Sequence, residues 1–112
     1  MSRDDATLLD ILQAAEMVVQ FTAGADQEVF LNDPKTQAAV LHKLLLMGEA
    51  VKRLSMDFRS RYPGVPWKAI AGMRDKLIHS YDAVDVRETW KVAISEVPQL
   101  IPVLRGLLEP GA

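Results

Sequence analysis

Apolar residues recur every three or four positions along most of this chain, and no stretch keeps the two-residue alternation of a half-buried strand. This spacing predicts an all-α protein. At 112 residues the chain is long enough for one hydrophobic core, so we expect a single domain over residues 1–112. Proline and glycine punctuate the periodic segments and divide them into a bundle of four to five helices.

The first half of the chain contains two strong helix-boundary signals. An apolar stripe predicts a helix over residues 5–23, and Gly24 stands where a left-handed residue ends many helices. Residues 25–32 read as a connection. Asp33 is then an oxygen-bearing N-cap, and the proline after it suits the first helical position. The second helix is therefore predicted over residues 34–61.

The second predicted helix is apolar around much of its circumference. Its main stripe is widened by three further leucines, Leu41, Leu45 and Leu46. A helix of this kind needs cover on two sides, so we predict that it also lines the interface of a homodimer; burial within one monomer is the alternative. Gly48 costs the helix about 1 kcal/mol relative to alanine. We expect it to permit the close approach of another backbone.

The second half of the chain opens on its clearest break, residues 62–66. Pro66 is expected at the first position of a third helix that runs to about His79. Asp85 and the glutamate three residues after it have the spacing of a capping box, which predicts a fourth helix. We expect that helix to kink or restart near Pro98, since proline lacks a backbone donor, and the last helix to end near residue 108. The residues expected to face inward are Trp90, Ile94 and Val97.

Positive charge is concentrated in one segment. The chain has a net charge of −2, which argues against a protein that coats nucleic acid through bulk charge. Residues 52–76, however, hold seven of the 13 lysines and arginines and two acids, so that this segment carries +5 and the remainder −7. The cations are Lys52, Arg53, Arg59, Arg61, Lys68, Arg74 and Lys76. The segment is either a solvated loop with its flanking helix ends or a surface that guides an anion.

Several classes of chemistry find no support in the sequence. There is no cysteine, so no disulfide or thiolate is available and a reducing compartment suits the chain. Paired histidines at metal-ligand spacing and glycine-rich phosphate loops are also absent, so we expect no metal and no cofactor. The N-terminal residues lack the pattern of a signal peptide, and no uncharged run is long enough to span a bilayer. We therefore expect a cytoplasmic protein without a membrane partner.

Arg74 is the least expected residue on the third predicted helix. On a helical wheel it falls in the middle of an apolar arc formed by Trp67, Ile70, Leu77, Ile78 and Tyr81. A guanidinium among apolar side chains is costly unless it is paired or faces a cleft. Two readings stay open: a structural ion pair with a carboxylate such as Glu49, or an arginine held in place for an anionic ligand.

His79 follows Arg74 by five residues. On a continuous helix the two side chains would point about 140° apart, since each residue turns the helix by about 100°. They can serve one substrate only if the helix ends near His79 or a second subunit closes the site. A lone histidine is more often structural than catalytic, and His42 is left in that class. Arg74 and His79 nevertheless form the only catalytic set that the sequence offers.

Arg74 to Tyr81 read R-x4-H-x-Y, which resembles the signature of the HepT-like ribonucleases of the HEPN superfamily. The likeness spans about residues 5–108, and Asp75 stands where many relatives have asparagine, which we interpret as a change of tuning. Further matching elements are Gly48-Glu49-Ala50, Val65-Pro66-Trp67, Ile70-Ala71-Gly72-Met73, Trp90 and Pro98.

The resemblance implies an all-α homodimer in which two such motifs meet at the subunit interface. It also implies a metal-independent endoribonuclease, in which the ribose 2′-OH attacks the adjacent phosphate of RNA and leaves a 2′,3′-cyclic phosphate. His79 would be the general acid or base, and Arg74 would hold the phosphate. Asp75 and Glu49 would support them. The cations expected to guide the RNA backbone are Lys52, Arg53 and Lys76.

The same resemblance implies a toxin of a type VII HepT/MntA-like toxin–antitoxin pair. Its partner would be a cognate MNT-type nucleotidyltransferase, the antitoxin, which transfers AMP to Tyr81. On an ideal helix Tyr81 lies about two turns from Arg74 on the same side, so an adenylate there would block the anion site. A core tyrosine is the alternative for Tyr81. Two other functions stay open: a non-catalytic nucleotide- or substrate-binding subunit of the nucleotidyltransferase, and a structural dimerisation module.

Overall fold

The computed structural model describes residues 2–108, and these residues form helices and turns without a strand. The predicted all-α bundle is therefore confirmed. The described residues contain more and shorter helices than the four to five expected, because the predicted second helix is divided in two and the predicted connection contains a short helix. The elements are α1 (Arg3–Thr22), α2 (Gln27–Leu31), α3 (Pro34–Arg53), α4 (Met56–Arg61), α5 (Trp67–His79), the 3₁₀ turn η1 (Tyr81–Ala83), α6 (Val86–Lys91), the π-helical turn η2 (Val92–Glu96) and α7 (Val97–Leu108).

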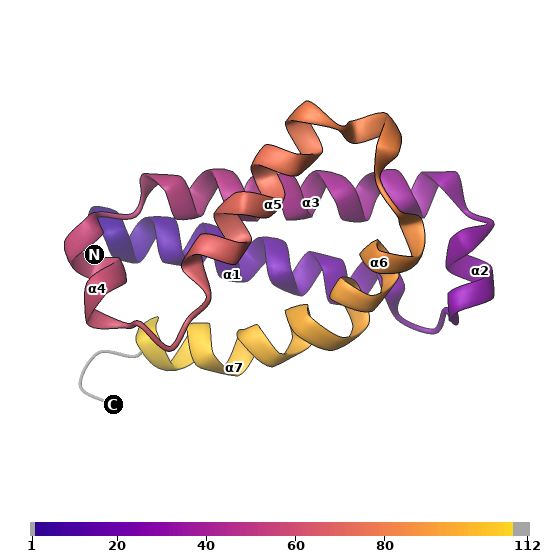
Figure 1. Cartoon of the computed structure of the whole chain (residues 1–112). Helices are drawn as coiled ribbons and strands as arrows, with labels where there is room; N and C mark the ends of the chain where they lie inside the picture. Colours follow the sequence, from indigo (N-terminus) through magenta and orange to yellow (C-terminus); the bar gives the residue numbers. More distant parts are fainter. Residues whose placement is uncertain (1, 109–112) are drawn as a thin grey trace.

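Two long antiparallel helices, α1 and α3, lie side by side and form the base of the bundle (Figure 1). Helix α7 packs along α1, whereas α5 crosses α3 at a steep angle and projects beyond it (Figure 1). The core lies where α1, α3 and α7 meet. Its most deeply buried large side chains are Leu8, Ile11, Val18, Phe30, Val40, Val51, Val97 and Leu104.

The ends of the two long helices follow local chemistry. Ser2 and Asp5 form a capping box at the start of α1, and Gly24 has a φ of 75° directly after the last turn of that helix. Asp33 Oδ1 accepts a hydrogen bond from the Thr36 backbone N–H at 3.2 Å, which caps α3. The stop at Gly24 and the start at Asp33 are thus confirmed.

Two predictions about the first half of the chain are wrong. Residues 25–32, expected to be a connection, include the short helix α2, whose Phe30 is buried against Trp90 with 5.2 Å between ring centroids. The second helix does not run unbroken to residue 61. It stops at Leu54, and Ser55 caps the separate helix α4 because its hydroxyl oxygen accepts a hydrogen bond from the Phe58 N–H. The apolar spacing continues across this break, so periodicity alone could not reveal it.

The C-terminal segment differs from the prediction in two places. Pro66 is the N-cap of α5 rather than its first helical residue. Near Pro98, where the sequence predicts a kink or a restart, the wider turn η2 joins α6 to α7: the Val97 N–H donates to the carbonyl of Val92, five residues back, and α7 then runs from Val97 to Leu108. The π turn shifts the side chains around the axis, so Ile94 is exposed instead of inward, while Trp90 and Val97 are buried as expected. Within residues 2–108, no helix is both long and apolar enough to cross a bilayer.

Candidate active site

Gly48 allows α5 to cross α3 at very short range. A Cβ atom added to Gly48 would overlap the Cβ of Arg74 and would lie 2.9 Å from the carbonyl oxygen of Ile70. The predicted close approach of a second backbone is confirmed. Because the two helices touch at this point, Glu49, the next residue of α3, comes within reach of the Arg74 guanidinium.

Arg74 is paired with two carboxylates. Its Nε donates to Glu49 Oε1 at 2.6 Å, and its Nη1 donates to Asp75 Oδ1 at 3.0 Å. These hydrogen bonds, first that with Glu49 and then that with Asp75, raise the pKa of Arg74 above its ordinary value, so the guanidinium stays charged. The side chain is 25% exposed. The ion pair that the sequence left open as one reading is present, and the guanidinium also reaches the surface.

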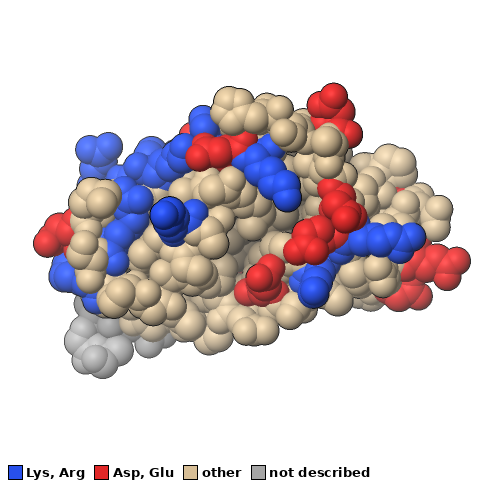
Figure 2. Space-filling model, viewed as in Figure 1, with Lys and Arg blue, Asp and Glu red and all other residues tan. Residues whose placement is uncertain are grey.

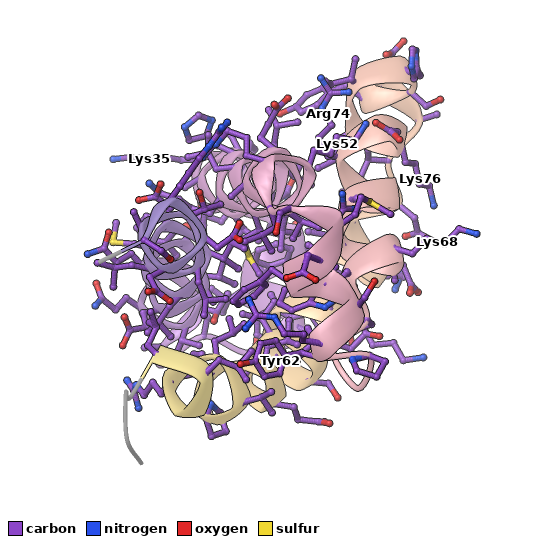
Figure 3. The ribbon with its side chains drawn as sticks, turned by 90° about the vertical axis from the view of Figure 1, so that its left-hand side faces the viewer. Lys35, Lys52, Tyr62, Lys68, Arg74 and Lys76 are labelled. Atoms are coloured by element: carbon purple, nitrogen blue, oxygen red, sulfur yellow. The ribbon has the colours of Figure 1, made fainter. Side chains whose placement is uncertain are left out.

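Lys52 extends this pair into a cluster. Its Nζ donates to Asp75 Oδ1 at 2.5 Å, so one carboxylate oxygen is shared by cations of α3 and α5. Hydrogen bonds from Lys52 and then from Arg74 hold the pKa of Asp75 below its ordinary value. Figure 3 shows Lys52 and Arg74 close together between the two helices. Glu49, Lys52, Arg74 and Asp75 are called the charged cluster below.

The other two predicted RNA-guiding cations do not join the charged cluster. Arg53 turns toward α1, where its Nη2 lies 3.6 Å from Asp10 Oδ2. Lys76 is exposed on α5 and points away from the bundle, on the same side as Lys68 (Figure 3). Of the three cations, only Lys52 lies beside Arg74.

His79 is the last residue of α5 and is exposed. The Ser80 N–H donates to the Lys76 carbonyl at 2.9 Å and closes the helix. The predicted helix end near His79 is confirmed. The prediction that Tyr81 continues the arc of Arg74 is wrong, because the chain has already left the α-helix and Tyr81 begins the 3₁₀ turn η1. Tyr81 is 54% exposed, which also excludes a tyrosine buried in the core of this chain.

The uneven charge of the sequence is visible on the surface. On the face that Figure 2 shows, Lys and Arg gather along α5 and at the end of the molecule formed by α4, whereas acidic and basic side chains are mixed around α6. No group of three or more potential metal ligands occurs within residues 2–108. The charged cluster therefore lies on the cationic side of the described part of the chain.

An apolar groove between α5 and α7 was not predicted from the sequence. Its space of about 350 Å³ is lined mainly by hydrophobic side chains that each read as ordinary core residues. The spacing of these residues in the sequence does not indicate that α5 and α7 diverge, so the groove could not be predicted. Lining residues include Leu44, Met47, Ile70, Met73, Val97 and Leu100.

Comparison with known proteins gives one consistent result. A family model described as ribonuclease HepT-like matches residues 11–107. A protein named "Probable ribonuclease HepT" in Thermococcus cleftensis is 46% identical over 93 residues, which cover 83% of this chain and 84% of that protein. A protein described as a candidate RNase in Methanocaldococcus jannaschii is 41% identical over 104 residues, covering 93% of this chain and 86% of that protein. Another such protein, from Caldanaerobacter subterraneus, is 41% identical over 99 residues and 88% of each chain. No solved structure matches significantly.

Proposed function

Because the chain belongs to the ribonuclease HepT-like family, we propose that it is a metal-independent endoribonuclease with Arg74 and His79 as its catalytic groups. One observation carries this proposal. Arg74 is fixed at the α3–α5 crossing by Glu49 yet reaches the surface, and His79 stands at the exposed end of the same helix. An anion-binding group and a proton-transfer group are thus held on one rigid element.

The proposed reaction is an internal transesterification. A general base removes the proton of the ribose 2′-OH, and the resulting oxygen attacks the adjacent phosphorus. The bond from phosphorus to the 5′-oxygen breaks, that oxygen takes a proton from a general acid, and a 2′,3′-cyclic phosphate remains. An imidazole can act as either base or acid near neutral pH, which is the role of His79. Arg74 binds the phosphate and offsets the charge that builds on its oxygens.

A homodimer would supply the second set of groups. The base and the acid act at opposite ends of the reacting phosphate, and one chain carries a single histidine at this place. Two exposed apolar side chains flank His79, Ile78 at 47% and Tyr81 at 54%. Apolar surface beside a polar site is typical of protein interfaces. A second copy that covers it would bring two Arg74–His79 sets together.

Exposure of Tyr81 supports the proposed regulation by AMP transfer. The exposed residue is accessible to a cognate MNT-type nucleotidyltransferase, which would make this chain the toxin of a type VII HepT/MntA-like pair. The added adenylate carries a negative phosphate close to the end of α5, where it would repel RNA. Incubation with the nucleotidyltransferase and ATP should add one AMP to wild type but not to Tyr81→Phe, as read by mass spectrometry.

The decisive experiment is RNA cleavage in excess EDTA, with wild type beside His79→Ala and Arg74→Ala. We expect cleavage by wild type alone and products that end in 2′,3′-cyclic phosphate. Circular dichroism checks that each variant is folded, and the same variants should relieve growth arrest at equal expression. Cleavage that requires added metal, or that persists in folded His79→Ala, would contradict the proposal.

The charged cluster also favours a second function, nucleotide or substrate binding without catalysis. Its two cations and two carboxylates sum to zero charge, which suits a reversible phosphate contact made for a partner nucleotidyltransferase. In that case calorimetry detects nucleotide binding that depends on Arg74, while unmodified wild type cleaves no RNA even at high protein concentration.

A further inference from the structure

Asp75 lies between two cations that come from different helices. Its Oδ1 accepts from Lys52 Nζ of α3 at 2.5 Å and from Arg74 Nη1 of α5 at 3.0 Å. Ammonium and guanidinium groups bind carboxylate and phosphate oxygens with similar geometry. Lys52 and Arg74 therefore already hold an anionic oxygen in the way that they would hold an oxygen of the RNA backbone.

We propose that Asp75 is an internal competitor of RNA: its carboxylate occupies the phosphate position between Lys52 and Arg74 and leaves when RNA binds. This inference rests on the proposed function, because it names the regulation of that same site. It makes Lys52 a phosphate ligand beside Arg74. It also assigns to Asp75 a role that lowers RNA affinity, rather than the supporting role expected from the sequence.

The two carboxylates of the charged cluster differ in what they hold. Glu49 binds Nε of Arg74, which leaves the Nη edge of the guanidinium available. Asp75 binds that Nη edge, and its carboxylate makes no hydrogen bond within residues 2–108 other than those with Lys52 and Arg74. Rotation of the Asp75 side chain is therefore enough to free Lys52 Nζ and the Nη edge of Arg74, while Glu49 still holds Arg74 Nε in place.

Charge decides how strongly the site attracts RNA. With Asp75 in place, the charged cluster is neutral; without that carboxylate it would carry +1. Since the pKa of Asp75 lies below its ordinary value, the carboxylate is charged at neutral pH and has to be displaced rather than protonated. Every RNA-binding event then exchanges one anion for another on the same two cations.

The test measures RNA affinity rather than cleavage. The parent is His79→Ala in EDTA, so that a fluorescent single-stranded RNA oligonucleotide stays intact, and fluorescence anisotropy gives Kd over a series of salt concentrations. Asp75→Asn in this parent should lower Kd about fivefold at low salt, which is the effect of one exposed charge pair. The slope of log affinity against log salt should steepen by about 0.7, the equivalent of one neutralised phosphate on a single strand, because binding no longer expels an internal carboxylate.

Asp57→Asn is the matched control. It makes the same change in net charge within the same cationic segment, but Asp57 pairs only with Arg61 on α4, at 3.5 Å. We expect less than a twofold change in Kd for this variant, about the size of a weak exposed pair. An equal gain in RNA affinity from Asp57→Asn and Asp75→Asn would show that only net charge matters, and would overturn the inference.

Lys52→Gln supplies an independent measurement that does not depend on the folding of Asp75→Asn. It should raise Kd about fivefold, because one phosphate ligand is lost. An unchanged Kd for Lys52→Gln, or equal or weaker binding by folded Asp75→Asn, overturns the inference, as does the absence of RNA binding by every variant. Failure of the proposed function is a separate result, since it is read from cleavage by wild type and not from these affinities.

Discussion

The two halves of α5 have different surroundings. In the first half, Trp67 and Ile70 are buried, and the Trp67 indole N–H donates to the Tyr62 carbonyl at 3.0 Å. In the second half, Ile78 and His79 are exposed and the helix projects beyond α3 (Figure 1). Arg74 and the charged cluster stand at the boundary between the anchored half and the free half.

This difference separates stability from chemistry. Buried apolar contacts fix the direction of α5, so the anchored half positions Arg74 without taking part in a reaction. The free half is held to the core by Leu77, which is 6% exposed, while its other face presents His79, and beyond it Tyr81, to an RNA, an enzyme or a second copy. Substitutions in the two halves should therefore have opposite profiles, and the predictions below are ordered by their effect on the free energy of unfolding.

The largest effect comes from the two isoleucines of α5. Ile70 is 5% exposed and Ile78 is 47% exposed, so the same residue type samples both halves of one helix. Ile70→Ala should lower the free energy of unfolding by about 3 kcal/mol, through lost burial and the cavity left behind. Ile78→Ala should change it by less than about 0.5 kcal/mol. Urea unfolding at low protein concentration measures both, and similar losses would show that the free half is covered.

Gly48 and Gly72 form the next pair. An added methyl group at Gly48 meets Arg74 and Ile70, whereas nothing lies within 4 Å of one added at Gly72 on α5. Gly48→Ala should cost about 2 kcal/mol through overpacking, even after the gain in helix propensity, and should also impair cleavage because the crossing shifts. Gly72→Ala should stabilise the protein by about 0.5–1 kcal/mol. A stable and fully active Gly48→Ala would mean that α5 can move away from α3 without consequence.

These pairs also show what the sequence could reveal. The close helix contact at Gly48 could be predicted from the sequence, because a glycine inside a long helix costs stability and commonly permits close approach of another backbone. The end of α5 could also be predicted, from the polar residues that follow His79. The break at Leu54 was not, because apolar residues continue at helical spacing through Phe58 while the cap at Ser55 is completed by Asp4, 51 residues away. Tertiary hydrogen bonds of this kind leave no local pattern.

The candidate site divides in the same way. The sequence singled out Arg74, because a guanidinium in an apolar arc is unusual, and it suggested Glu49 as a partner. It could not tell that Lys52 reaches Asp75 while Arg53, the next residue, turns toward α1, since both are cations in one helical turn. Lys52 lies one turn after Gly48, on the face of α3 that α5 crosses, whereas Arg53 faces α1; which helix crosses α3 at Gly48 is a property of the packed bundle.

Arg74→Met should have a small effect on stability and a large effect on activity. The Arg74 ion pairs are partly exposed and screened by solvent, so their loss should lower the free energy of unfolding only slightly. Cleavage should fall by about 10²-fold or more if Arg74 offsets charge in the transition state. Arg105→Met is the control. Arg105 also pairs with a carboxylate, Glu16, with 2.6 Å between its Nη2 and Glu16 Oε2, but this pair does not involve α5. The variant should therefore keep full activity. Equal activity in the two variants would remove Arg74 from the reaction.

The smallest effect concerns α4, whose Phe58 ring lies 6.2 Å from the ring of Trp67 in the anchored half of α5. Asp4 accepts hydrogen bonds from the Ser55 N–H at 3.0 Å and the Ser55 hydroxyl at 2.8 Å, and these lower its pKa below the ordinary value of 3.8. A carboxylate with a lowered pKa in the folded state stabilises that state above the unfolded pKa, and this contribution is lost as the pH falls through 3.8 and then through the folded value. The Tm of wild type should therefore exceed that of Asp4→Asn near neutral pH, and the difference should close on acidification.

Differential scanning calorimetry of wild type, Asp4→Asn and the control Asp82→Asn at matched pH values measures this difference. Comparison at each pH cancels the titration of the other carboxylates, and Asp82 makes no hydrogen bond through its side chain within residues 2–108. The Tm of Asp82→Asn should follow that of wild type throughout. If the Tm difference between wild type and Asp4→Asn does not depend on pH, the charge of Asp4 does not hold the start of α4. The anchored half of α5 then gains nothing from the charge of Asp4, and its contrast with the free half rests on burial and on the Trp67 hydrogen bond.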